Sequence, residues 1–335
     1  MKSIFAGLVA WVMMLVSFIP LKPSDKLGDA IKEARPPVES AAVTRDEAMA
    51  KGGGWYVTMD ENFDGDALPE NWTTSPHAKR NTEWWCADTV SVGAGQASVL
   101  CYKEDNHVCS AGVCPAQGVF TGGIETRKMV DGKSVNLFEQ AFGYFECRVM
   151  IPKGEGLWAA FWLQSPTQGN IGNQGRDGSE IDVFESVFAN DPTLVGSALN
   201  WDGYHSFYQS HGTRYDTGVN LYEGWHTYGV LWTPVRYVFF VDGKPTFETN
   251  ADRINRTPNF LRLTVESRPA GTVGPYGYTL GDMTATKDEP AVFSVDWVRV
   301  YQNTAFEPHI KAATDFANIN KPWIATVLGW FGKTL

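Results

Sequence analysis

The chain has 335 residues, of which 43% are hydrophobic and 13% aromatic, enough apolar material for one large core with appendages. Its formal net charge of −10 at pH 7 argues against nucleic acid and other strongly anionic polymers as partners, because a binding groove would have to overcome general repulsion. The 13 Trp, 12 Tyr and 19 Phe, combined with 33 Gly and 18 Pro, favour short strands joined by many turns.

The N-terminal segment has the pattern of an export signal. Lys2 precedes a nearly uninterrupted apolar run over residues 4–21, so residues 1–22 are predicted to be a signal peptide or an uncleaved membrane anchor. The protein is therefore expected to be secreted, or tethered through residues 4–21 to the outer face of a membrane. Residues 23–53 contain two adjacent prolines and run into three glycines, and they are predicted to be a linker.

Residues 54–303 predict an all-β domain of short apolar or alternating runs separated by turn residues. Asp242-Gly243 indicates a tight hairpin, since both residue types tolerate positive φ. So many antiparallel strands usually close into two packed sheets, as a sandwich or a jelly roll, and the sequence pattern does not choose between these two folds. The clearest predicted strands are Ala141–Ile151, Trp158–Leu163, Ser179–Phe188, Val195–Trp201, His226–Trp232, Tyr237–Val241, Phe260–Val265 and Ala291–Tyr301.

Residues 304–335 are predicted to be a C-terminal tail outside the β pattern. Its apolar stretch over residues 323–332 is too short to span a bilayer. A terminal helix packed on the domain is the expected structure, with an interfacial contact to a membrane or a partner as the alternative.

The five cysteines form no Cys-x-x-Cys pattern, and on that ground the sequence argues against zinc. In an exported protein, disulfides are permissible, and the local candidates are Cys86 with Cys101 across a hairpin and Cys109 with Cys114 within a loop. Cys147 lies in an apolar alternating segment, where we expect a buried free thiol.

An unusual cluster of acids occurs in the predicted strand over residues 179–188. Glu180 and Asp182 would share one face of a strand, but Glu185, five residues after Glu180, would point to the other face. A β-bulge at Val183–Phe184 would return Glu185 to the face of the other two. The two glutamate carboxylates would then lie about 5 Å apart, the separation that a retaining glycosidase needs. A solvated acidic face and a calcium cluster are the alternatives.

The sequence resembles glycoside hydrolase family 16, in the branch whose active-site strand carries a bulged Glu-x-Asp-x-x-Glu motif. The likeness covers roughly residues 55–302 and follows the expected order. Besides the acidic strand, it rests on Met59–Gly65, Phe142–Leu163, Trp225–Pro234, Phe239–Gly243 and Asp296–Tyr301.

The resemblance implies a concanavalin A-like β-jelly roll of two antiparallel sheets with an open concave cleft. It also implies an endo-acting retaining mechanism on a β-linked polysaccharide. By position, Glu180 is the nucleophile, Asp182 its partner and Glu185 the acid/base, and catalysis needs no cofactor. Asp182 is expected to hold Glu180 by a hydrogen bond and to help keep Glu185 protonated.

The resemblance also supplies candidate substrate-binding residues. Trp158 matches a cleft tryptophan whose indole face can stack on a sugar, whereas Trp162 is expected in the core. Asn200 and Trp201 occupy the neighbouring strand, where the family places substrate-binding groups. Glu266, followed by Arg268, is a further candidate, and these two residues depart from the usual laminarinase and lichenase pattern.

Similarity would assign a structural calcium on the convex face to Glu61, the Gly95 carbonyl and Asp296. The expected function is hydrolysis of a neutral β-glucan with β-1,3 or mixed β-1,3/1,4 linkages by a monomer. Agarase-like cleavage of a galactan and transglycosylation on the same site are the alternatives, and a noncatalytic carbohydrate-binding jelly roll is the alternative of another class.

Overall fold

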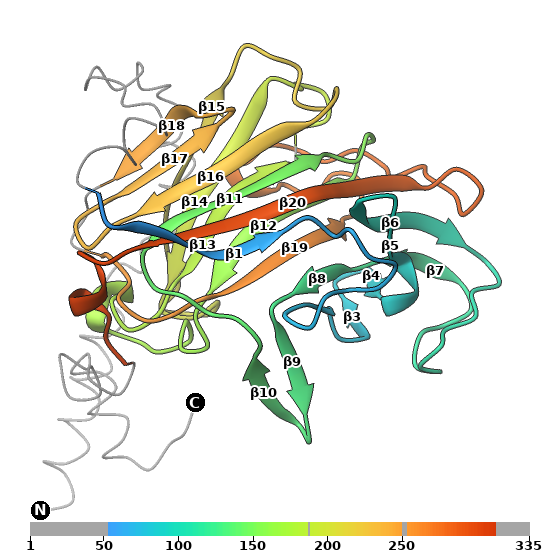
Figure 1. Cartoon of the computed structure of the whole chain (residues 1–335). Coiled ribbons are helices and arrows are strands. Elements are labelled where there is room, and N and C mark those ends of the chain that lie inside the picture. The colour runs from blue at the N-terminus through green and yellow to red at the C-terminus, as the bar shows by residue number, and fades with distance from the viewer. Residues whose placement is uncertain (1–52, 187, 250–252, 313–335) are drawn as a thin grey trace, which may run out of the picture. The chain divides into compact units, whose positions relative to one another are not determined.

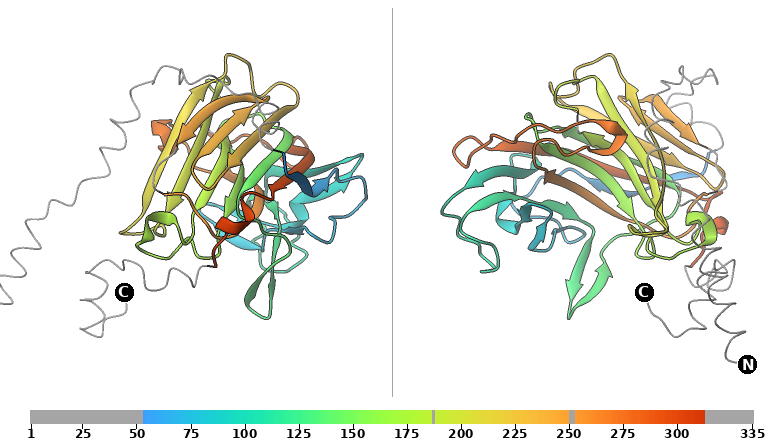
Figure 2. Two further views of the ribbon diagram at one scale, coloured as in Figure 1. Left: turned by 60° about the vertical axis from the view of Figure 1, so that its left-hand side comes forward. Right: turned by 180° about the vertical axis from the view of Figure 1, so that it is seen from behind.

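The computed structural model describes residues 53–186, 188–249 and 253–312, which form two stacked β-sheets and a small separate hairpin (Figures 1 and 2). The larger sheet has eleven strands in the order β18-β17-β16-β11-β20-β6-β7-β4-β3, with β1 added on β20 and β5 on β6. The smaller sheet has seven strands in the order β15-β14-β13-β12-β19-β8-β2.

The strands of the larger sheet are β1 (Trp55–Glu61), β3 (Ala78–Arg80), β4 (Glu83–Trp85), β5 (Val90–Gly93), β6 (Gln96–Glu104), β7 (Gly118–Thr121), β11 (Gly143–Met150), β16 (His226–Trp232), β17 (Tyr237–Val241), β18 (Lys244–Thr249) and β20 (Ala291–Asn303). Those of the smaller sheet are β2 (Thr73–Thr74), β8 (Gly123–Glu125), β12 (Leu157–Gln164), β13 (Glu180–Ser186), β14 (Leu194–Trp201), β15 (Gln209–Asp216) and β19 (Phe260–Ser267). The separate hairpin consists of β9 (Arg127–Val130) and β10 (Lys133–Asn136). The helical segments of the described residues are four 3-10 helices, η1 (Ala87–Thr89), η2 (Asn173–Gly175), η3 (Pro275–Gly277) and η4 (Glu307–His309).

The core lies between the two sheets and is built by the inward side chains of both. Phe184 of the smaller sheet packs on Tyr228 of the larger one, with ring centroids 4.1 Å apart. Alternation produces this core: on β12, the odd-numbered residues from Leu157 to Leu163 face inward. The predicted two-sheet jelly roll is confirmed. Between these strands the pairing is antiparallel throughout, except that β4 runs parallel to β7.

The eight strands predicted most clearly are all present, as β11 to β14, β16, β17, β19 and β20, and their ends differ from the predicted ones by two residues at most. The predicted hairpin is also confirmed. Asp242 and Gly243 join β17 to β18 with φ angles of 48° and 71°, the positive values that a tight hairpin turn requires.

The predictions of a signal or anchor over residues 1–22 and of a terminal helix over residues 323–332 lie outside the described residues. So does nearly all of the predicted linker. Within the described residues, no helix combines the length and the apolar character that crossing a bilayer demands.

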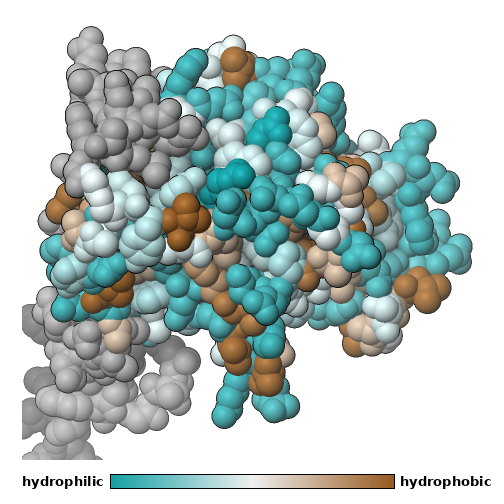
Figure 3. All heavy atoms as spheres, viewed as in Figure 1, coloured by the Kyte–Doolittle hydropathy of each residue, from teal (hydrophilic) through white to brown (hydrophobic). Residues whose placement is uncertain are grey.

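The hairpin β9–β10 projects from the sandwich, and its strands pair only with each other among the described strands (Figure 1). Apolar side chains gather on its surface, as the brown spheres at the bottom of Figure 3 show. The exposed apolar residues of this hairpin are Met129, Val130 and Val135.

Candidate active site

The acidic strand β13 lies in the middle of the smaller sheet, between β12 and β14, and it contains a β-bulge. Phe184 pairs with Phe161 of β12 and Asp182 pairs with the next residue, Trp162, so Val183 has no partner of its own. The register on the β14 side also shifts between Asp182 and Glu185. The predicted bulge at Val183–Phe184 is confirmed.

The bulge separates the side chains of β13 into two sets. Three apolar side chains enter the core between the sheets: Ile181, Val183 and Phe184. The three carboxylates lie on the opposite face, and each is less than a tenth exposed: Glu180, Asp182 and Glu185. Without the extra residue, period-two alternation would have placed Glu185 in the core.

Glu180 is surrounded by groups that favour its ionised form. Its Oε1 accepts a hydrogen bond of 3.0 Å from the Asn200 side-chain amide, and its Oε2 accepts one from the Tyr204 hydroxyl. The pKa of Glu180 is raised overall, because the effect of burial outweighs these two donors and the positive charge of Arg262, which lower it. The carboxylate is thus held in a fixed orientation with hydrogen bonds on both oxygens.

Glu185 accepts a hydrogen bond at each of its two carboxyl oxygens. Its Oε1 accepts a hydrogen bond of 2.9 Å from the Trp158 indole N–H, and its Oε2 accepts one of 2.8 Å from the Tyr276 hydroxyl. Burial raises the pKa of Glu185 to about 7, with a further increase from the negative charge of Glu180. Glu185 can therefore hold a proton near neutral pH.

Asp182 is linked to Glu180 through Asn200. The Asn200 amide donates a second hydrogen bond, of 2.6 Å, to Asp182, and its own oxygen accepts one of 2.6 Å from Tyr208. The described hydrogen bonds of Asp182 thus run to Asn200, and the direct bond expected between Asp182 and Glu180 is replaced by this bridge. Burial raises the pKa of Asp182 well above its usual range, and the charges of Glu185 and Glu180 raise it further.

Trp158 and Glu266 are neighbours across β12 and β19, on the face of the carboxylates. Arg80 and Arg268 both pair with Glu266, at 2.8 and 2.5 Å. The Arg268 guanidinium also lies 5.1 Å from the centre of the Trp158 ring. At this end of the carboxylate-bearing sheet face, the Trp158 indole therefore lies beside the Glu266 carboxylate, whose negative charge is balanced by two arginines.

Two tryptophans lie where the sequence did not place them. Trp201 belongs to the core cluster, because alternation on β14 directs it away from Asn200, so it is removed from the candidate substrate-binding residues. Trp162 was expected in the core, but it alternates with the inward residues of β12. Its indole N–H donates to Thr264, and the Arg262 guanidinium covers its ring at 4.1 Å, so it is a buried residue of the carboxylate-bearing sheet face.

Sequence reasoning missed three tyrosines of the site: Tyr204 and Tyr276 donate to carboxyl groups of β13, and Tyr208 donates to Asn200. Tyr204 and Tyr208 follow β14 in the loop to β15, and Tyr276 lies in the short helix η3. Loop residues carry no periodic signal, so their proximity to β13 is a tertiary result. The approach of Tyr276 also depends on Gly196, where a Cβ atom would lie only 2.2 Å from the tyrosine ring.

The two candidate calcium carboxylates already have partners. Asp296 forms an ion pair with Arg148, and Glu61 accepts the backbone N–H of Phe63 at 2.8 Å. An arginine on Asp296 disfavours a divalent cation at the same oxygens. The calcium site stays a prediction.

The five cysteines are free thiols in the structure. Cys101 lies in the core while the Cys86 sulfur contacts Asp88, so the suggested pairing of these two cysteines does not occur. The Cys109 and Cys114 sulfurs lie 3.0 Å apart. Cys147 is fully buried, as expected, and burial raises the pKa of its thiol.

Comparison with known proteins finds a matching family model and related curated proteins. Residues 115–273 match the model of glycosyl hydrolases family 16. The endo-1,3-1,4-beta-glycanase ExsH of Rhizobium meliloti (strain 1021) is 25% identical over 209 residues, which are 61% of this chain but only 40% of ExsH. A beta-glucanase of Rhodothermus marinus is 27% identical over 264 residues, covering 75% of this chain and 87% of the relative.

Among solved structures, the catalytic domain of an endo-1,3-beta-glucanase (laminarinase) from Thermotoga petrophila RKU-1 has the same fold. It superposes with a TM-score of 0.57 at 20% identity, over 75% of this chain and 98% of that domain. The matched family segment contains the bulged strand with all three carboxylates. The resemblance to glycosyl hydrolases family 16 that the sequence motifs indicated is confirmed, and the match to the family model covers residues 115–273.

Proposed function

We propose that this chain is a retaining endo-β-glycanase that hydrolyses a neutral β-glucan with β-1,3 or mixed β-1,3/1,4 linkages. The observation that carries the proposal is the pair of glutamates that the β13 bulge brings to one face with different surroundings. Both glutamates accept hydrogen bonds on both oxygens, and burial raises the pKa of each. The positive charge of Arg262 lowers the pKa of Glu180, whereas the negative charge of Glu180 helps to raise the pKa of Glu185 to about 7. Such a difference between two carboxyl groups is what assigns a nucleophile and an acid.

In the proposed reaction, the Glu180 carboxylate attacks the anomeric carbon while Glu185 gives its proton to the departing glycosidic oxygen. Water then donates a proton to Glu185 and attacks the glycosyl-enzyme ester, which releases the sugar and restores Glu180 as a carboxylate. Both steps occur on one face of β13. Asn200 and Tyr204 orient Glu180, and Asp182 acts through Asn200.

A neutral glucan is the proposed substrate for two reasons. Both curated relatives described above carry names that refer to β-glucan or β-glycan cleavage. The net charge of −10 and the arginines engaged by Glu266 leave little positive charge for a sulfated polymer. An agarase-like galactanase and a transglycosylase would use the same carboxylates, and reducing-end release from laminarin, lichenan, agarose and carrageenan separates these substrates.

Glu180→Gln and Glu185→Gln test the catalytic proposal. Each variant should lose turnover and keep the wild-type circular dichroism and melting temperature, because glutamine preserves the shape and most contacts of the side chain. Wild-type turnover in either variant contradicts the assignment. A chain that binds glucan normally but never turns it over would instead be a carbohydrate-binding jelly roll.

Azide distinguishes the two roles, because the small anion can enter the space that a truncated carboxylate leaves. With an activated aryl β-glycoside, Glu185→Ala and azide should give a β-glycosyl azide, formed from the glycosyl-enzyme. Glu180→Ala and azide should give the α-glycosyl azide by direct displacement from the other side of the sugar. If Glu185→Ala gave the α-glycosyl azide and Glu180→Ala the β-glycosyl azide, Glu185 would be the nucleophile and Glu180 the acid/base.

We further infer that the protein acts outside the cell, on the basis of the apolar run over residues 4–21. N-terminal sequencing of the mature protein tests this inference. A start after residue 22 supports a cleaved signal, and an intact N-terminus in the membrane fraction supports an anchor. Intact protein in the soluble cell interior contradicts both.

Size-exclusion chromatography tests the proposed monomer.

A further inference from the structure

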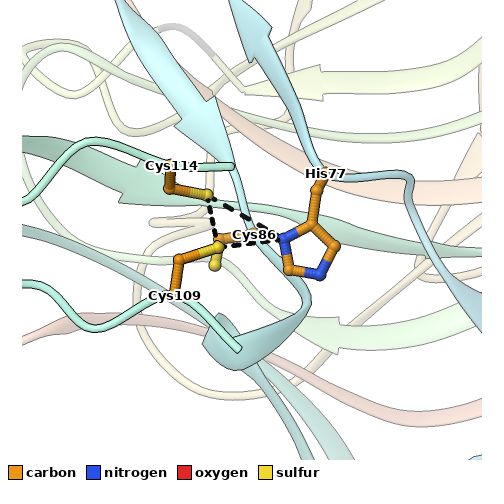
Figure 4. A group of neighbouring side chains, drawn as sticks. All are labelled: His77, Cys86, Cys109 and Cys114. Atoms are coloured by element: carbon orange, nitrogen blue, oxygen red, sulfur yellow. Dashed lines mark hydrogen bonds between the residues drawn. The ribbon is translucent and has the colours of Figure 1, made fainter. Parts of the chain in front are cut away.

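A second chemical centre lies away from β13, at the edge of the larger sheet. Three cysteines and a histidine converge there, with one ligand atom from each lying within 4.8 Å of all the others (Figure 4). The Nδ1 atom of His77 is 3.6 Å from the Cys109 sulfur and 3.9 Å from the Cys114 sulfur, and the two sulfurs are 3.0 Å apart. Cys86 completes the group.

The group comes from two chain segments that the fold brings together. His77 immediately precedes β3 and Cys86 immediately follows β4, so they lie at the open end of the β3–β4 hairpin. Cys109 and Cys114 lie in the loop that joins β6 to β7, and β7 runs beside β4. The Cys86 backbone N–H also donates to Thr121 at 2.8 Å.

This donor set matches the requirements of zinc. Three thiolates and one imidazole form a Cys3His site, and a tetrahedron with zinc–sulfur bonds of about 2.3 Å and a zinc–nitrogen bond of about 2.0 Å has sulfur–sulfur edges of about 3.8 Å and sulfur–nitrogen edges of about 3.5 Å. The two sulfur–nitrogen distances of 3.6 and 3.9 Å agree with such an edge, and the 3.0 Å sulfur pair needs only a small separation. The Cys109-x4-Cys114 spacing is also within the range seen at zinc sites.

Neighbouring groups support Cys86 as a ligand. The Cys86 sulfur is 3.4 Å from Nε2 of His107, whose Nδ1 is 3.0 Å from Glu104 and whose ring stacks on Phe120 at 3.8 Å. The Nε2 atom of His107 thus faces a ligating sulfur while Glu104 fixes the orientation of the ring, as outer-shell groups do at metal sites. Asp88 also approaches Cys86, and its Oδ2 already accepts the Ser110 backbone N–H at 2.8 Å.

We propose that His77, Cys86, Cys109 and Cys114 bind a structural zinc ion. Four protein ligands close the coordination sphere, so the ion would serve structure rather than catalysis. The lack of a Cys-x-x-Cys motif argued against zinc in the sequence, but the ligands come from two segments that only the fold joins.

The site would fix the hairpin that reaches the substrate face. The β3–β4 hairpin carries Arg80 and Asn81, whose side chains donate to Glu266 at 2.8 and 3.4 Å. Zinc would clamp the open end of this hairpin to the β6–β7 loop. That loop exposes Val108 and Val113, so it has little apolar burial of its own to hold it in place.

Metal analysis of the purified full chain tests the proposal without reference to activity. The wild type should contain one zinc per chain, and Cys109→Ser and His77→Ala should each lose it. Cys147→Ala is the matched control, because it removes a buried thiol far from the group in sequence and should retain the metal. Cobalt substitution of the wild type should give the visible absorption of a tetrahedral thiolate site, and Cys109→Ser should lack it.

Stability provides a second readout. A chelator should lower the melting temperature of the wild type and of Cys147→Ala, and it should leave that of Cys109→Ser unchanged. Intact mass and thiol titration after denaturation identify the competing result, a Cys109–Cys114 disulfide. Metal-free protein with that disulfide overturns the proposal, as does zinc that persists in both Cys109→Ser and His77→Ala. Either result would leave the glycanase proposal untouched.

Discussion

Tyr276 donates its phenolic hydrogen bond to Oε2 of Glu185 across 2.8 Å, although the two residues are 91 positions apart in the chain. Tyr276 has a positive φ of 64° and lies in η3, after β19, and its ring rests against Gly196 of β14. Together with the Trp158 indole, it occupies both oxygens of the proposed acid/base. Burial raises the pKa of Glu185, and the hydrogen bond from this loop residue lowers it in part.

Tyr276→Phe should move the alkaline limb of the kcat/KM profile to higher pH. The hydroxyl lowers the pKa of Glu185, so its loss raises that pKa above about 7. Because the acid works only while protonated, activity then persists to higher pH, by about one pH unit for one hydrogen bond. Tyr278→Phe is the matched control, since that hydroxyl accepts from Asn190. If the alkaline limb of Tyr276→Phe does not shift, Tyr276 does not influence the pKa of Glu185.

Gly196→Ala should reproduce the effect of Tyr276→Phe by a steric route. The new Cβ would lie 2.2 Å from a ring carbon of Tyr276, so the ring has to move and its hydroxyl leaves Glu185. Gly93→Ala serves as the control, because a Cβ there meets nothing within 4 Å. The Gly196→Ala/Tyr276→Phe double variant should show nearly the same alkaline limb as either single variant. Additive shifts in the double variant would contradict the shared cause.

Asn200→Ala should lower kcat about 10- to 100-fold, because the variant loses hydrogen bonds to two carboxyl groups. KM should change little, since the described contacts of the Asn200 side chain are to protein groups. Asn200→Asp keeps the size but adds a negative charge, and it should be at least as impaired. Steady-state kinetics on a soluble glucan check this. A higher KM with an unchanged kcat would instead support the sequence prediction that Asn200 binds the sugar.

Arg262→Met should destabilise the fold by about 3–5 kcal/mol, because it leaves the buried carboxylate of Glu125 without its close partner. Arg127, at 3.4 Å, compensates in part. The double variant Glu125→Gln/Arg262→Met should recover much of the loss, since no unpaired charge then remains. Urea unfolding measures the free energy of unfolding of the single and the double variant.

A surface pair supplies the comparison for Arg262. Arg236→Met removes an exposed partner of Glu248, and it should change the free energy of unfolding by no more than about 1 kcal/mol. Equal losses in Arg236→Met and Arg262→Met would show that burial does not set the energy of the Glu125 pair.

The sequence by itself determined the strands and the chemistry of β13. Strand alternation is local, so short apolar runs predicted eight strands to within two residues. The five-residue interval between Glu180 and Glu185 required a bulge for the carboxylates to share a face, and the structure has it. Alternation also forbids Asn200 and Trp201, which are adjacent on a regular strand, from both facing a substrate, and the structure places Trp201 inside.

Only the tertiary structure decided which groups surround the carboxylates and which cysteines meet. Tyr204 and Tyr276 reach β13 from loops, and loop positions depend on how the sheets stack rather than on any repeating pattern. His77 joins Cys109 and Cys114 because β4 lies beside β7. Contacts of this kind link segments far apart in the chain, so no local window of sequence contains the information that specifies them.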